Sequence, residues 1–292
     1  MRIKKYIIFF VIVILFYIIH LNWLNLRLNW LILNKDAEIG IAIIKNQKEW
    51  LIGSNNSLPM LSVFKYFVAL KVLDKLEKEK ISLNKEVIIH KNMVNEKLYS
   101  PMLDKYKTFP FKISIANLLK YMISESDNNA CDILINYAGG TKEIQKYINS
   151  IGFVNVEISE TELAMNNEIE KQYLNKAHPI DIIRTMKFVR DKNILSDSSR
   201  KFLDEIMIST VTGKDKFKAG LPQDVILGHK TGSSSRKQNG VKIADNDAGY
   251  VFTPNGEVYY IAVMIKDSKM SDDENAKLIS KISKITYMYL KK

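Results

Sequence analysis

The chain has 292 residues, a length that fits one large domain or two closely packed ones. With 47% hydrophobic and 26% charged residues it has the composition of a globular protein, which excludes a disordered chain. The net charge of +11 does not indicate a nucleic-acid partner, because the lysines are scattered and often stand beside glutamates. A mildly positive field instead favours an anionic small-molecule substrate.

Residues 1–34 have the character of a targeting segment, and we expect them to lie outside the fold. Basic residues occupy positions 2, 4 and 5, and residues 6–19 form an unbroken apolar run of 14 residues. A run of this length suits a secretory signal and is short for a membrane span. No A-x-A-like cleavage site follows, and apolar residues continue to position 33. The segment is therefore predicted to be either a signal peptide or an uncleaved N-terminal anchor of an exported, periplasmic protein, and membrane contact is expected only through it.

The hydrophobic pattern beyond the leader predicts strands at both ends of the chain and helices between them. Strands are expected at residues 39–44 and 49–52, and again at 225–230, 247–253 and 259–265, with a hairpin turn at 253–256. Helices are expected from about Ser62 and at residues 115–122, 129–137, 142–151, 179–190 and 273–290. This order predicts a discontinuous α/β domain with an inserted all-helical domain.

Three short motifs in a particular order carry the chemistry. They are Ser62-Val63-Phe64-Lys65, Ser126-Asp127-Asn128 and Lys230-Thr231-Gly232. Each is weak alone, because such tripeptides and spacings occur by chance in many proteins. Together they supply a nucleophile, two lysines and a second hydroxyl, which is what acyl transfer to serine requires.

From about Ile39 to its end the chain resembles the class A serine β-lactamases, and more narrowly their Bacteroidetes branch. The narrower match rests on residues 99–101, 124–132, 212–222, 229–234 and 244–249. The spacings agree, with 104 residues from Ser126 to Lys230 and 36 from Ser126 to Glu162. The resemblance implies an antiparallel sheet flanked by helices, in a domain of residues 35–60 and 208–292, with an all-helical domain at 61–207. It also implies β-lactam substrates, penicillins or cephalosporins, and antibiotic resistance.

Roles follow from that resemblance for the first two motifs. Ser62, at a helix N-terminus, would attack the β-lactam carbonyl, and Lys65 one turn later would lie on the same face. The backbone N–H groups of Ser62 and Ser233 would form the oxyanion hole. Ser126 would pass a proton to the departing lactam nitrogen. Asp127 is expected to be a structural acceptor.

Further residues would bind the substrate. Tyr99 and Asn128 would line the site, with Asn128 bonded to the substrate's side-chain amide, while Lys230, Thr231, Gly232 and Ser233 would receive its carboxylate. Family members usually supply an arginine to that carboxylate, whereas residues 214–218 offer only lysines. A lysine keeps the charge but lacks the bidentate fork.

Glu162 and Asn166 decide between a hydrolase and a penicillin-binding protein. The stretch Glu162-Leu163-Ala164-Met165-Asn166 fits the family's E-x-x-L-N form, with Met165 in the leucine position. In that form the glutamate activates the deacylating water and the asparagine shares it. Glu170 has the wrong spacing. The loop also lacks an evident arginine–aspartate clamp, so its stability must come from elsewhere.

The remaining reactive residues predict no metal, no cofactor and no disulfide. The four histidines are isolated, and Cys131 is the single cysteine, expected to be a buried helix residue. We expect a monomer. The rival interpretations are a D-alanyl-D-alanine peptidase, which shares the motifs without the glutamate, and a non-hydrolytic penicillin-binding sensor that stays acylated.

Overall fold

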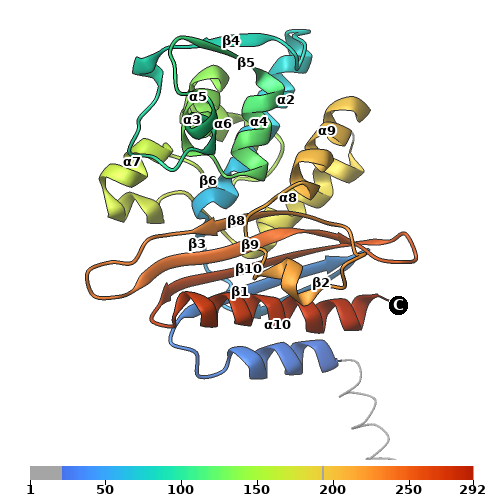
Figure 1. Ribbon diagram of the computed structural model, residues 1–292. Coiled ribbons are helices and arrows are strands. Elements are labelled where there is room, and N and C mark those ends of the chain that lie inside the picture. The colour runs from blue at the N-terminus through green and yellow to red at the C-terminus, as the bar shows by residue number, and fades with distance from the viewer. Residues whose placement is uncertain (1–21, 193, 292) are drawn as a thin grey trace, which may run out of the picture.

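A five-stranded antiparallel sheet forms the centre of the computed structural model, which describes residues 22–192 and 194–291 (Figure 1). The strand order is β2-β1-β10-β9-β8. The bounds are β1 Glu38–Lys45, β2 Lys48–Gly53, β8 Leu227–Ser233, β9 Lys242–Phe252 and β10 Val258–Ser268. Strands from the two ends of the chain therefore share one sheet, and the expected antiparallel sheet flanked by helices is confirmed.

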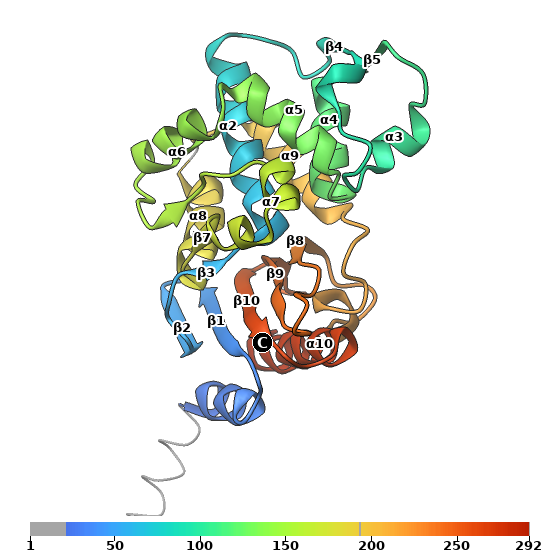
Figure 2. The same ribbon diagram turned by 90° about the vertical axis from the view of Figure 1, so that its left-hand side faces the viewer.

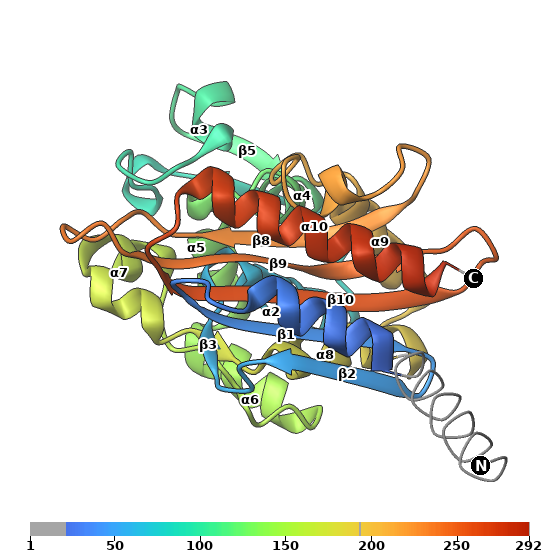
Figure 3. The ribbon, with the colours of Figure 1, turned by 90° about the horizontal axis from the view of Figure 1, so that it is seen from below.

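The two faces of the sheet pack against different helices because side chains alternate along each strand. On β1, Ala42 and Ile44 join the core beneath the helical layer, while Ile41 and Ile43 join the core on the opposite face. The second core is closed by α10, Asp272–Leu290, which runs along the lower face of the sheet (Figure 3).

The helical layer is built around α2, whose residues face the core on nearly every side (Figure 2). Its helices are α2 Lys65–Lys78, α3 Pro101–Lys105, α4 Ile115–Ser124, α5 Asn128–Ala138, α6 Thr141–Ser150, α7 Glu162–Asn167, α8 Pro179–Asp191 and α9 Asp197–Ile208. Short 3-10 turns lie at η1 Leu61–Phe64, η2 Lys91–Met93, η3 Ile169–Tyr173 and η4 Phe217–Gly220. The small strands are β3 Leu58–Pro59, β4 Glu86–Ile89, β5 Phe111–Ser114, β6 Val156–Glu157 and β7 Lys176–Ala177.

We expected residues 1–34 to lie outside the fold, and this expectation is wrong for residues 22–32. Residues 22–32 form a helix, and Leu24 and Leu28 are fully buried in the core that α10 closes. Trp23 stacks on Tyr289 of α10, with ring centroids 5.8 Å apart. Apolar residues spaced three and four apart allow this packing. The helical spacing is hard to recognise in the sequence because apolar residues occupy both faces of the helix.

The basic start and the apolar run at residues 6–19 lie outside the described residues. Among the helices that are described, none is long and apolar enough to cross a membrane.

Candidate active site

Ser62 lies in η1, directly before α2, where the chain is held against the sheet. Leu61 has a φ of 46°, a left-handed conformation that costs a non-glycine residue energy. Asn246 of β9 supports this backbone, because its Nδ2 donates to Pro59 O at 2.8 Å and to Met60 O at 3.1 Å. Gly232 is required beside it, since a Cβ there would lie 2.4 Å from Met60 O. The sheet therefore fixes the position of Ser62.

Lys65 begins α2 and is fully buried beneath Ser62. Its Nζ lies 3.0 Å from Glu162 Oε1 and donates to Asn128 Oδ1 at 2.6 Å and to Ser126 O at 2.7 Å. Ser62 Oγ donates to the same Glu162 oxygen at 3.4 Å. One carboxylate oxygen thus contacts both the serine hydroxyl and the buried ammonium group.

Ser126 and Asn128 lie at the junction between α4 and α5. Ser126 has a φ of 60°, another left-handed residue, and Asp127 caps α5 by accepting from Ala130 N at 2.7 Å. Asp127 also accepts from Met102 N and Ser100 Oγ, so the expectation of a structural acceptor is confirmed. Burial raises the pKa of Asp127, although the hydrogen bonds from these three donors act to lower it.

Lys230 lies on β8, the edge strand that faces the helical layer, and is fully buried. Its Nζ donates to Ser126 Oγ at 2.9 Å and to Thr231 O at 2.9 Å. Burial, and after it the positive charge of Lys65, hold the pKa of Lys230 well below its usual value. Ser126 therefore lies between two buried lysines.

A cavity of about 370 Å³ opens above these groups. Of the predicted site residues, its walls include Ser62, Tyr99, Ser126, Asn128, Thr231 and Ser233. Lys65, Lys230 and Glu162 are buried beneath it, and Gly232 lies against the Ser62 backbone. Asn166 is exposed on α7 and does not line the cavity. The volume falls in the range of small-molecule sites.

The loop that carries Glu162 is held by two residues for which the sequence predicted no role. Asp132 of α5 accepts from Glu162 N at 2.8 Å and from Leu163 N at 2.9 Å. Asn175 is fully buried, and its Oδ1 accepts from Ser159 N and Glu160 N, both at 2.9 Å. These bonds replace the absent arginine–aspartate clamp. Asp132 follows Asn128 by one helical turn, which was a signal in the sequence that it faces the site.

Burial raises the pKa of the Asp132 carboxyl to about 6, although the two backbone donors oppose the shift. Glu162, which Asp132 positions, is only 7% exposed.

Lys216 is the lysine of the 214–218 segment that reaches the cavity wall. Its side chain is buried, and its Nζ pairs with Asp245 and donates to Asn246 O at 3.3 Å. Lys242 lies 3.8 Å from the same Asp245 carboxylate. The charge of Lys216 is thus partly balanced within the protein, and a substrate carboxylate would share it with Asp245.

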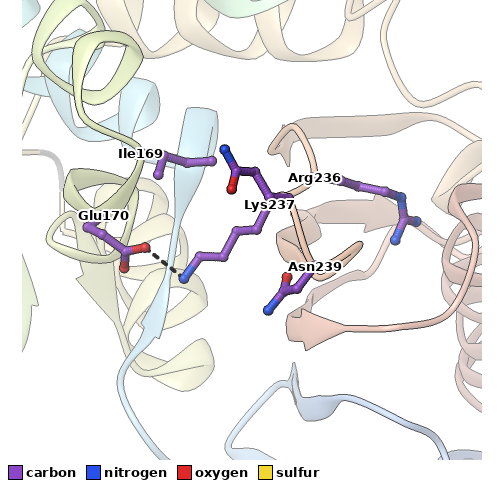
Figure 4. Close-up of a pocket in the computed structure, with 6 residues that line it drawn as sticks. Ile169, Glu170, Arg236, Lys237 and Asn239 are labelled. Atoms are coloured by element: carbon purple, nitrogen blue, oxygen red, sulfur yellow. Dashed lines mark ion pairs between the residues drawn. The ribbon is translucent and has the colours of Figure 1, made fainter.

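A second cavity, of about 590 Å³, lies between η3 and the hairpin that joins β8 to β9 (Figure 4). Lys237 crosses it, with its Nζ 2.9 Å from Glu170 Oε1 and 4.7 Å from the centre of the Tyr173 ring. Tyr173 in turn donates to Asp267. Although this cavity is larger, no serine lines it, whereas the motif residues Ser62, Ser126 and Thr231 line the smaller one. Within the described part of the chain, no cluster of side chains could hold a metal ion.

Comparison with known proteins supports the same interpretation. A model of the β-lactamase enzyme family matches residues 25–290. A β-lactamase from Bacteroides uniformis is 43% identical over 255 residues, which cover 87% of this chain and 86% of the relative. The β-lactamase VEB-1 from Pseudomonas aeruginosa is 35% identical, with 87% and 86% covered. The solved structure of a class A β-lactamase from Bacteroides cellulosilyticus superimposes with a TM-score of 0.89, at 40% identity, covering 92% of this chain and 97% of that one.

Proposed function

The chain belongs to the class A β-lactamases, and from that membership we propose that it opens β-lactam rings through an acyl-Ser62 intermediate. As a β-lactamase it is a hydrolase whose activity confers resistance to β-lactam antibiotics. One observation supports the residue assignment most strongly: Glu162 Oε1 contacts both Ser62 Oγ and Lys65 Nζ.

In acylation, Ser62 Oγ bonds to the lactam carbonyl carbon and the carbon–nitrogen bond breaks. Lys65 or Glu162 takes the hydroxyl proton, and their charged atoms lie 3.0 Å apart. Ser126 Oγ gives a proton to the departing nitrogen and is replenished through the lysines on either side of it; Lys230 Nζ lies 2.9 Å away. The N–H groups of Ser62 and Ser233 would bind the oxyanion, and such a donor contributes about 3–4 kcal/mol.

Substrate binding is assigned to the cavity wall. Lys230, Thr231 and Ser233 would receive the substrate carboxylate, with Gly232 keeping β8 close to Ser62. Asn128 and Tyr99 would contact the acyl side chain from the opposite wall. Penicillins and cephalosporins both carry the carboxylate and the amide that these groups would bind.

In deacylation, a water oxygen attacks the acyl carbon and Glu162 accepts the water proton. The bond from the acyl carbon to Ser62 Oγ then breaks, and Glu162 returns the proton to Ser62 Oγ, which restores the hydroxyl. The burial of Glu162 beside Lys65 favours this step, and hence a hydrolase rather than a peptidase or a sensor that stays acylated. Asn166 lies one turn after Glu162 on α7 but is exposed and does not line the cavity, so its proposed sharing of the water is supported by the E-x-x-L-N pattern alone.

The remaining assignments concern the whole molecule. The basic start and the apolar run at residues 6–19 support export to the periplasm, with residues before 22 as a signal peptide or an anchor. We propose a monomer, because the cavity walls and the groups beneath them need no residue from a second copy of the chain. We divide the chain into an α/β domain, residues 35–60 and 208–292, and a helical domain, residues 61–207. With this division, the cavity would lie between the two domains.

Steady-state hydrolysis of a chromogenic cephalosporin, followed with intact-protein mass spectrometry, tests this function. Wild-type protein should turn over many equivalents, whereas Ser62→Ala should neither turn over nor gain the mass of benzylpenicillin. A full-mass adduct that persists on Ser62→Ala would place the nucleophile elsewhere. A burst of one equivalent from the wild type, without turnover, would indicate the sensor instead.

A further inference from the structure

The helix at residues 22–32 has two apolar faces. Leu24 and Leu28 point into the core and are fully buried. Trp23, Leu26, Trp30 and Leu33 follow one another at spacings of three and four residues, and their exposed fractions are 37%, 54%, 70% and 62%. At 3.6 residues per turn these four residues cover roughly a quarter of the helix circumference, on the side opposite the core.

Single exposed leucines are ordinary on a protein surface, but a contiguous stripe with two tryptophans is not. The stripe is bounded by polar residues, with Asn22, Asn25 and Asn29 along one border and Arg27 along the other. Burial of the opposite face means that the stripe cannot turn inward without unpacking the core. We therefore expect an apolar partner to cover this stripe.

A row of lysines lies beside this stripe. The helices at 22–32 and α10 both cover the lower face of the sheet (Figures 1 and 3). On α10, Lys281 and Lys284 are exposed three residues apart, and Met288, 54% exposed, follows four residues later. Lys277, one turn before Lys281, is also exposed but pairs with Asp273 at 2.6 Å. The lower face of the molecule thus combines an apolar stripe with a basic one.

The sequence that leads into the helix indicates what covers this face. Residues 6–19 are entirely apolar and follow a basic start, a pattern that enters a membrane during export although the run is short for a span. Tryptophan is enriched at the boundary between acyl chains and headgroups, and lysines attract anionic headgroups.

We propose that the face formed by Trp23, Leu26, Trp30, Leu33 and the lysines of α10 docks on an anionic lipid bilayer. The helix lies in the plane of the interface, as amphipathic helices do. The folded domain therefore contacts the membrane surface directly and is not connected to it only through a flexible linker. The helical layer covers the other side of the sheet (Figure 1), and Val63 and Phe64, which follow Ser62, pack in the core beneath that layer. The cavity at Ser62 therefore does not face the docked bilayer.

Fluorescent labels on the full-length protein can test the docking separately from binding by residues 6–19. A cysteine replaces Leu26 on the proposed face, and in a matched variant it replaces Val154, which is 66% exposed and lies between α6 and β6. Cys131 is buried and should not compete for the label. Each variant receives an environment-sensitive dye and is mixed with phosphatidylglycerol-rich vesicles. The emission should shift to the blue at position 26 and stay unchanged at position 154.

The charge component is tested with the double variant Lys281→Glu/Lys284→Glu, whose hydrolysis of a chromogenic cephalosporin should equal that of the wild type. Its affinity for phosphatidylglycerol vesicles should fall by about fivefold per lysine, with no change on phosphatidylcholine vesicles. Unchanged emission at position 26 on vesicles that carry the protein would overturn the proposal. So would a blue shift at position 26 without vesicles that grows with protein concentration, because the face would then bind a second copy of the chain.

Discussion

The Nζ of Lys65 lies 3.0 Å from Oε1 of Glu162, and both side chains are buried. A buried charge is costly without a partner, and each of these two groups is the partner of the other. The same carboxylate oxygen accepts from Ser62 Oγ at 3.4 Å. We expect the pair to couple acylation and deacylation, because one carboxylate oxygen would serve both the serine hydroxyl and the deacylating water.

Asp132→Asn should slow deacylation more than acylation. Asparagine has one carbonyl oxygen where aspartate has two, so either Glu162 N or Leu163 N loses its acceptor. An unsatisfied buried N–H costs about 1–3 kcal/mol, which should loosen the Glu162 loop. Pre-steady-state kinetics with benzylpenicillin separates the two steps. Equal slowing of both would contradict a role that is confined to this loop.

The same variant should remove a pH dependence of stability. The folded-state pKa of Asp132 is raised to about 6, so the folded protein binds the proton more tightly than the unfolded chain does. Its contribution to the free energy of unfolding is therefore greatest below about pH 4 and declines as the pH rises to about 6. Urea unfolding of the wild type and Asp132→Asn across pH 4–7 gives a difference curve, and a flat curve would show that Asp132 has an ordinary pKa.

Asn246→Leu should lower the free energy of unfolding and slow acylation. The variant removes the donors to Pro59 O and Met60 O and the acceptor for Ile265 N. Loss of these buried bonds should cost at least about 2 kcal/mol. Asn84→Leu, at an exposed turn, should stay within about 0.5 kcal/mol of the wild type. If Asn246→Leu acylates as fast as the wild type, Asn246 does not position Ser62.

Lys230 should produce an alkaline limb in kcat/KM at a pH below the usual lysine range. Its pKa is well below the usual value because it is buried near Lys65, so it loses its proton early as the pH rises. A neutral Lys230 no longer attracts the substrate carboxylate, and kcat/KM should fall. In Lys230→Arg the limb should move to higher pH or disappear, since arginine stays charged. An unmoved limb would assign it to another group.

A chain that begins at Lys35 should be markedly less stable than one that begins at Asn22. The shorter chain exposes the surface that Leu24 and Leu28 cover, and each buried leucine contributes about 1.5–3 kcal/mol. Chemical denaturation of both chains measures the difference. Identical midpoints would show that the helix at residues 22–32 adds nothing to the core.

The sequence predicted most of the sheet because its strands are short runs rich in β-branched and aromatic residues and are bounded by turn residues. The first half of β9, Lys242–Phe252, was missed because it contains Asp245 and Asn246. The strand expected at 225–230 is β8, Leu227–Ser233, and the turn at 253–256 does join β9 to β10. Ser62, Ser126 and Thr231 were recognised from local motifs, and they meet at one cavity.

Contacts between distant segments could not be predicted in the same way. Asn175 closes the Glu162 loop by bonding to Ser159 and Glu160, and Lys216 pairs with Asp245 across the sheet edge. An asparagine or a lysine can make such bonds with many partners, so its residue type alone does not identify them. The helix at residues 22–32 was missed for another reason, because apolar residues on both faces hide its periodicity.

Glu162→Ala provides the most direct test of the central claim that Glu162 activates the deacylating water. The variant should acylate at Ser62 and release product about 10²–10⁴-fold more slowly, the usual contribution of a positioned general base. Glu170→Ala is the matched control, because Glu170 is 71% exposed and pairs with Lys237 outside the Ser62 cavity. Intact-protein mass spectrometry after mixing with benzylpenicillin should show a persistent acyl adduct on Glu162→Ala and none on Glu170→Ala. An adduct that persists on Glu170→Ala while Glu162→Ala turns over normally would contradict the account.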